Sequence, residues 1–230
     1  MPYYEHNGAK LHYEFVGSVA GADRAPVLLL HGNGESMHVF DKAIEPLLDK
    51  LPFLAIDSRA HGESTGEAAG YDTMADDAAS LLRALNVECC DVVGYSDGAI
   101  TALLMALDHG VSFGRMILIG ANIYPEGLKL GVRLKMRGEL AKCRANSDER
   151  GAKLIEIMLS EPHIDPSELA AIKSRVYVLA GDRDMIRRSH TTKIFESMPN
   201  ATMIIFDRQG HDIPQRAYSR LADIMRRALK

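Results

Sequence analysis

A serine stands between two glycines in the segment GYSDG, residues 94–98, which follows an apolar run and precedes a long helical pattern. A serine on a sharp turn from a strand into a helix holds its hydroxyl above the sheet and needs small neighbours on both sides. Gly94 and Gly98 leave that space. The alternative is an ordinary glycine-rich turn in which Ser96 caps the helix. The placement of the motif favours Ser96 as a nucleophile.

A serine hydroxyl is a weak nucleophile and needs a base, which in turn needs an orienting acid. Among the nine histidines, His211 is the predicted base, because it follows Gly210 after the last apolar run and precedes the final helical pattern. His190 falls within a helical pattern after Asp184. We expect a structural role for His190.

The turn GDRD, residues 181–184, offers two candidates for the acid. Asp184 lies further along the loop, from where it reaches more easily toward His211. Asp182 is next to the glycine and is suited to hold the turn through hydrogen bonds to nearby backbone. Asp207 is a third candidate. We predict that Asp184 is the orienting acid.

Acyl transfer also needs hydrogen-bond donors for a developing oxyanion, and a helix N-terminus or a glycine-rich turn supplies backbone N–H groups for this. The N–H of Asp97 directly follows the candidate nucleophile. The turn HGNG, residues 31–34, follows the first long apolar run, and we predict Asn33 as the second donor. We expect substrate to contact Asp97, Gly32 and Tyr95.

Six apolar runs, each followed by a polar or glycine-bearing turn, predict the strands that position these residues. Amphipathic segments between the runs predict helices on both faces of a doubly wound, mostly parallel α/β sheet. Asn7-Gly8 between two alternating segments predicts an N-terminal antiparallel hairpin. The runs begin VLLL, FLAI, DVVG, RMILI, RVYVLA and ATMIIF, and the predicted helices span 38–50, 73–85, 99–109, 187–197 and 214–229.

We expect residues 1–230 to form a single domain with one insertion. Residues 122–174 contain no convincing strand but two helical patterns, at 127–145 and 149–159. This interval is expected to form a short helical cap over the sheet.

Composition excludes several other classes of protein. A net charge of -4 with no basic stripe argues against nucleic-acid binding. The longest aliphatic run, Val27–Leu30, is far shorter than a membrane span, and no secretion signal is visible, so a cytoplasmic location with no membrane partner is expected. Three cysteines without CxxC spacing argue against a disulfide framework or a structural zinc site.

Five motifs in order make the chain resemble the α/β-hydrolase fold superfamily: LLLHGNG, DSRAHGES, GYSDGA, GDRD and the GH at 210–211. The order Ser96, Asp184, His211 is typical of that fold. One departure is Ala60, where many relatives have a glycine before the histidine. A zinc site from His31, His61 and His211 is disfavoured, because no thiolate or helical histidine pair accompanies them.

A finer resemblance is to amino-acid ester hydrolases of the valacyclovir-hydrolase type, within the carboxylesterase branch. It rests on GYSDGAITALLMAL and ILIGANIY. The resemblance implies that Asp97 helps to hold a substrate ammonium group. The alternative is that Asp97 complements the dipole of the helix that it begins.

The resulting prediction is a serine hydrolase that cleaves small carboxylic esters through an acyl-enzyme, with no metal or organic cofactor, as a monomer or homodimer. A hydrolase of carbon–carbon bonds and a cofactor-free haloperoxidase or perhydrolase are alternatives with a similar triad. A ligand-binding protein with slow turnover is an alternative of another class.

Overall fold

The computed structural model describes residues 2–17 and 24–229, and an eight-stranded sheet runs through this part of the chain. The strand order is β1-β2-β4-β3-β5-β6-β7-β8. β1 (Tyr3–His6) and β2 (Ala9–Val16) form an antiparallel hairpin, and β2 also pairs antiparallel with β4. All other neighbours are parallel. This confirms the predicted mostly parallel sheet with an antiparallel start.

The remaining strands coincide with the six apolar runs. Each is almost continuously apolar because it is covered on both faces. Their bounds are Val27–Leu30 (β3), Phe53–Ile56 (β4), Cys89–Tyr95 (β5), Ser112–Ile119 (β6), Arg175–Gly181 (β7) and Ala201–Phe206 (β8).

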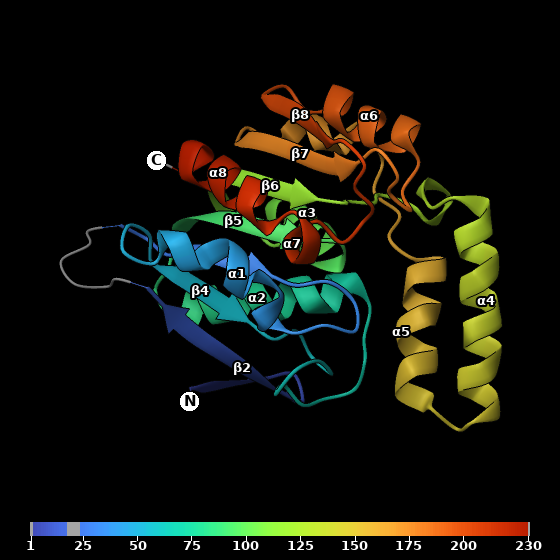
Figure 1. Ribbon diagram of the computed structural model, residues 1–230. Helices are drawn as coiled ribbons and strands as arrows, with labels where there is room; N and C mark the ends of the chain where they lie inside the picture. The colour runs from blue at the N-terminus through green and yellow to red at the C-terminus, as the bar shows by residue number, and fades with distance from the viewer. Residues whose placement is uncertain (1, 18–23, 230) are drawn as a thin grey trace.

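Helices cover both faces of the sheet (Figure 1). Alternate residues of a strand point to opposite faces. Leu28 accordingly packs in the core that holds residues of α2, α3 and α6, whereas Leu29 packs with residues of α1 and α8. The helices span Asp41–Ile44 (α1), Tyr71–Ala84 (α2), Asp97–Leu107 (α3), Arg188–Ser197 (α6) and Tyr218–Ala228 (α8).

Two predicted helices are interrupted. In place of one helix over 38–50, the chain forms a 3-10 turn (Met37–Phe40), the short α1 and a second 3-10 turn (Glu45–Leu47). Pro46 lacks the N–H that a continuous helix would need there. The predicted helix over 214–229 divides into α7 (Ile213–Arg216) and α8, with Ala217 at φ -119° and ψ 28° between them.

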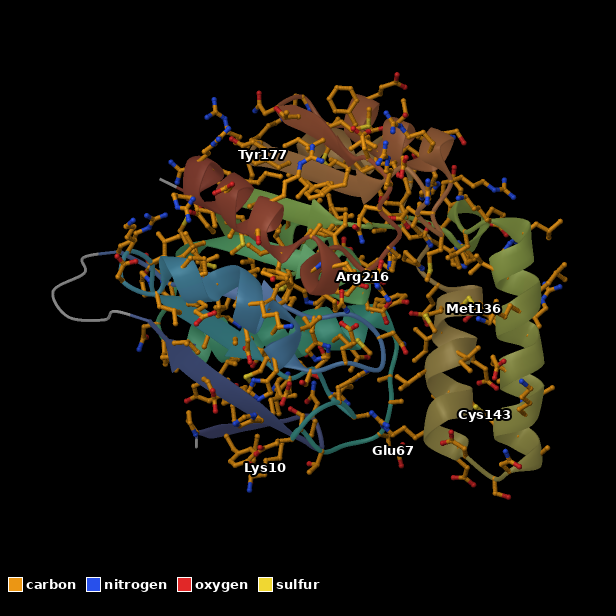
Figure 2. The ribbon with its side chains drawn as sticks, viewed as in Figure 1. Lys10, Glu67, Met136, Cys143, Tyr177 and Arg216 are labelled. Atoms are coloured by element: carbon orange, nitrogen blue, oxygen red, sulfur yellow. The ribbon has the colours of Figure 1, made fainter. Side chains whose placement is uncertain are left out.

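The connection between β6 and β7 carries a helical hairpin that stands beside the sheet (Figure 1). Its helices are α4 (Leu130–Ala145) and α5 (Glu149–Ser160). α4 begins three residues later than predicted, because Leu128 and Lys129 are extended and Leu128 forms an antiparallel bridge with Ile186. None of the residues of α4 is buried, whereas α5 buries Ala152, Leu154 and Ile157. Figure 2 shows Cys143 near the tip of this hairpin.

Within residues 2–17 and 24–229, no helix has the length and apolar character that crossing a bilayer would need.

Candidate active site

Ser96 lies on a strained turn between β5 and α3, at φ 53° and ψ -115°. Residues other than glycine rarely adopt a positive φ, and such strain is found mostly at functional sites. The flanking glycines make this turn possible. A Cβ atom at Gly98 would lie 2.0 Å from the carbonyl oxygen of Leu30, and one at Gly94 would lie 2.5 Å from the carbonyl oxygen of Gly98. Both positions therefore need glycine.

Ser96 is the first member of a chain of three side chains joined by hydrogen bonds. Nε2 of His211 lies 2.9 Å from Oγ of Ser96, and Nδ1 of His211 lies 2.8 Å from Oδ1 of Asp184. The three residues follow three different strands, β5, β7 and β8. Because these strands are parallel neighbours of β6 or of one another, their carboxyl ends bring the side chains to one edge of the sheet.

Asp184 is held in place by more than His211. The side chain is buried and accepts hydrogen bonds from the N–H groups of Ile186, at 2.9 Å, and Gly181, at 3.4 Å. Burial alone would raise the pKa of Asp184, but the bond to His211 and these backbone donors together hold that pKa below its usual value. A stable carboxylate therefore faces Nδ1 of His211, which fixes that nitrogen as the one that carries the proton.

The other two acid candidates lie elsewhere. Oδ1 of Asp182 accepts a hydrogen bond of 3.0 Å from the N–H of Gln209, which joins the loops after β7 and β8. Asp207 is exposed. The structure thus brings Asp184, and neither Asp182 nor Asp207, into hydrogen-bond contact with His211.

The loop after β3 passes directly beside Ser96. A Cβ atom at Gly32 would lie 3.2 Å from Cβ of Ser96 and 3.1 Å from the ring of Tyr95. Within the described residues, no acceptor pairs with the backbone N–H groups of Asn33 and Asp97. Two backbone donors on the elbow and on this neighbouring loop are thus left without partners.

A cavity of about 30 Å³ lies against Ser96. The lining comes from α2, α3, the connection between β6 and β7 with α5, and the loop after β7. The lining residues are Tyr71, Ser96, Asp97, Ile100, Gly120, Asn122, Leu128, Met158, Met185 and Ile186. Of the predicted substrate contacts, Asp97 is in this lining. Tyr95 is instead buried in the core, with its ring centroid 5.3 Å from that of His211.

The sequence match agrees with this geometry. The family model for the alpha/beta hydrolase fold matches residues 25–137, which include β3, the turn with Ser96 and the first half of α4. The chain has the α/β-hydrolase fold.

Individual relatives support the same placement. The chain is similar to the human protein named Serine hydrolase BPHL, at 34% identity over 126 residues, or 51% of this chain and 42% of that protein. It is similar to the putative carbamate hydrolase RutD of Caulobacter vibrioides, at 32% identity over 120 residues, or 50% of this chain and 44% of that protein. The chain thus spans less than half the length of these curated relatives.

Solved structures show the same fold. A thermophilic esterase from Thermogutta terrifontis superposes with a TM-score of 0.80 at 20% identity, and the match covers 96% of this chain and 93% of that one. At this level of identity the likeness concerns the fold alone.

Asp97 has two partners in this α/β-hydrolase fold. Its carboxylate accepts hydrogen bonds from Nδ2 of Asn33, at 3.0 Å, and from the hydroxyl of Tyr71, at 3.1 Å. Burial raises the pKa of Asp97, and the two donors act in the opposite direction. The carboxylate therefore joins the loop after β3, the turn that carries Ser96 and α2.

The hydrolase loop after β4 contains the departure at Ala60. This residue has φ 60°, in the left-handed region that favours the glycine of many relatives. The neighbouring Arg59 forms a buried, two-pronged ion pair with Asp77 on α2, at 2.5 and 2.7 Å. The loop is thus held by Arg59 although its conformation is strained at Ala60.

Three other buried histidines, His31, His61 and His190, form hydrogen bonds to backbone atoms. Nδ1 of His31 bonds to the carbonyl oxygen of Gly32 at 2.8 Å, and its Nε2 accepts from the N–H of Ser58 at 3.0 Å. Nε2 of His190 accepts from the N–H of Ile123 at 3.1 Å, and burial lowers the pKa of His190 to about 4. In the described ranges, no three acidic, histidine or cysteine side chains are grouped so that they could hold a metal ion.

Sequence reasoning missed one ionisable group at this site. Glu35 lies in the loop after β3, and Nε2 of Gln215 donates a hydrogen bond to its Oε1. Burial raises the pKa of Glu35 to about 7, against the lowering effects of His211 and of the bond from Gln215. Its position in a polar turn at the carboxyl end of β3 was the only signal in the sequence.

Proposed function

We propose that the protein is a serine hydrolase that cleaves carboxylic esters of small molecules through an acyl-enzyme intermediate. The observation that carries the proposal is the pair of hydrogen bonds that joins Ser96 Oγ to His211 Nε2 and His211 Nδ1 to Asp184. This arrangement activates a hydroxyl at neutral pH.

In the proposed reaction, Oγ of Ser96 attacks the ester carbonyl carbon as its proton moves to Nε2 of His211. Asp184 holds the imidazole in the reactive tautomer and stabilises the imidazolium. The backbone N–H groups of Asn33 and Asp97 receive the oxyanion. His211 then gives its proton to the departing alcohol. In the second half, a water molecule transfers a proton to His211 and attacks the acyl carbon. His211 then returns this proton to Oγ of Ser96 as the acyl–oxygen bond breaks, which releases the acid and restores the serine.

The size of the cavity supports a short acyl group. Its volume of about 30 Å³ is room for two or three water molecules, each of which needs about 10–15 Å³. Leu128, Met158 and Ile186 make part of the wall apolar. We expect acetate or propionate esters to be cleaved faster than long-chain esters.

Esters of α-amino acids are a second candidate, because the carboxylate of Asp97 lines the cavity beside Ser96. The resemblance of residues 94–107 to amino-acid ester hydrolases of the valacyclovir-hydrolase type supports this candidate. An ammonium group would have to share Asp97 with Asn33 and Tyr71, which already donate to it.

Labelling with a fluorophosphonate probe tests the proposal. The wild type should become labelled and lose activity, whereas Ser96→Ala should not react. Ser160→Ala, which alters a serine near the end of α5, is the matched control and should label like the wild type. Equal labelling of the wild type and Ser96→Ala, or none in either at high probe concentration, would overturn the assignment. An unlabelled wild type would favour the ligand-binding alternative.

The substrate class is tested by comparing esters of free α-amino acids with their N-acetylated and plain acyl counterparts. Recognition of ammonium predicts that N-acetylation lowers kcat/KM strongly and that Asp97→Asn removes the difference. An unchanged kcat/KM on acetylation would exclude this candidate while leaving the esterase proposal intact.

A further inference from the structure

Glu35 and Gln215 connect two parts of the candidate site that lie 180 residues apart in the chain. Glu35 follows the loop that carries Asn33, and Gln215 lies on α7, four residues after His211. Nε2 of Gln215 donates a hydrogen bond to Oε1 of Glu35. One side-chain bridge therefore links the oxyanion loop to the segment that carries the base.

The same two side chains leave one oxygen each without a partner. Oε2 of Glu35 and Oε1 of Gln215 are both buried, and neither has a hydrogen-bond partner among the described residues. Two acceptors cannot bond to each other, and an unsatisfied buried polar atom destabilises the folded state. A carboxylate at Glu35 would leave both atoms in this condition.

A proton on Oε2 of Glu35 would give both of these oxygens a hydrogen-bond partner. A neutral carboxylic acid has a donor and an acceptor side by side, and a primary amide has the complementary pair. The bond from Gln215 Nε2 to Glu35 Oε1 would then be matched by one from Glu35 Oε2 to Gln215 Oε1. The two planar groups form a closed pair with two reciprocal hydrogen bonds.

We propose that Glu35 is protonated in the folded protein and forms this two-bond acid–amide pair with Gln215, which positions the oxyanion loop against the His211 segment. The protonation of Glu35 stands independently of the proposed function. Its effect on catalysis rests on that function.

The groups around Glu35 agree with a neutral acid. The carboxyl is half-buried, and the nearby carboxylate of Asp97 on α3 disfavours a second negative charge, whereas His211 favours one. Tyr95 at the end of β5 lies beside Glu35 and Gln215, and burial raises the pKa of Tyr95, so its hydroxyl carries no charge. The net result is a pKa of Glu35 close to neutrality.

Three variants distinguish the acid–amide pair with two hydrogen bonds from a single hydrogen bond between Gln215 and a Glu35 carboxylate. Glu35→Gln replaces the acid by an amide, which forms the same reciprocal pair with Gln215 but cannot titrate. Gln215→Leu removes the amide partner and leaves the side chain of Glu35 unaltered. Glu45→Gln changes an exposed glutamate in the 3-10 turn that follows α1 and is the control for loss of one negative charge.

The first experiment is an NMR pH titration of protein with ¹³C-labelled glutamate carboxyl groups, in which Glu35→Gln assigns the Glu35 signal. We expect a midpoint between about pH 6 and 8 in the wild type and in Glu45→Gln. In Gln215→Leu the midpoint should fall by at least one pH unit, because the protonated acid loses the acceptor of its proton. A wild-type midpoint below pH 5, or a midpoint in Gln215→Leu that is unchanged or raised, would overturn the proposal. So would a shift caused by Tyr95→Phe alone, since the hydroxyl of Tyr95 would then be the partner of Gln215.

The second experiment measures kcat/KM for a short ester from pH 6 to 9. The wild type should lose activity through an ionisation that matches the NMR midpoint, and Glu35→Gln should lack that step. Gln215→Leu should lower kcat/KM about 10-fold at pH 6, as the positioning of both loops is lost. If the pH profile of kcat/KM for Glu35→Gln still showed this ionisation, the acid–amide pair would not position the site. If the wild type had no esterase activity, the titration would still decide the protonation.

Discussion

Nδ2 of Asn33 lies 3.0 Å from Oδ2 of Asp97, so the loop after β3 is tied to the first turn of α3 directly beside Ser96. Both residues are predicted oxyanion donors through their backbone N–H groups. The contact between their side chains therefore fixes the relative position of the two donors. Tyr71 holds Asp97 from the other side.

Asp97→Asn should lower kcat about 10-fold for plain acyl esters, because an amide holds Nδ2 of Asn33 less firmly than a carboxylate does. Steady-state kinetics on acetate esters check this, with Asp108→Asn at the far end of α3 as the control. If only esters of free α-amino acids were affected, Asp97 would act on the substrate and the positioning role would be wrong.

Asp184→Asn should reduce kcat about 10⁴-fold with little change in KM, because the amide no longer enforces the reactive tautomer of His211. Asp182→Asn removes a similar charge two residues away and should alter kcat less than about 3-fold, since Asp182 bonds only to backbone across the turn. Similar losses in both variants would show that the whole turn matters and that Asp184 has no special role.

Stability should fall as pH rises, through Glu35. Its pKa is raised in the folded protein from 4.5 to about 7, so the folded state binds more protons than the unfolded state between these values. The free energy of unfolding of the wild type should therefore drop relative to Glu35→Gln between about pH 4.5 and 7, by about 1–2 kcal/mol after allowance for partial exposure. Urea unfolding of both proteins at a series of pH values measures this difference in the free energy of unfolding. A difference that stays constant, or grows with pH, would contradict the raised pKa.

Ala60→Gly should stabilise the protein by about 0.5–1 kcal/mol. An L-residue in the left-handed region costs about 1–2 kcal/mol, which exceeds the entropy that glycine adds to the unfolded chain. Thermal and urea unfolding test this. Ala141→Gly in the exposed middle of α4 is the matched control and should destabilise by about 1 kcal/mol. Destabilisation at both positions would mean that the loop does not strain Ala60.

The strands were predictable because burial on both faces demands continuous apolar runs, and all six runs became strands of the parallel part of the sheet. The bounds of the helices were less predictable from the sequence. An amphipathic pattern over 38–50 does not show how Pro46 divides it, and nothing in the local sequence marks the break at Ala217.

The sequence by itself determined the turn at Ser96, because glycine spacing and the change from strand to helix are local properties. It also determined which turns lie at the carboxyl edge of the sheet. Only the tertiary structure decided that Asp184 rather than Asp182 meets His211, that Asp97 holds Asn33, and that Glu35 meets Gln215. These contacts join residues 27 to 180 positions apart, and such pairs depend on strand order and on the paths of the loops, which local pattern does not encode.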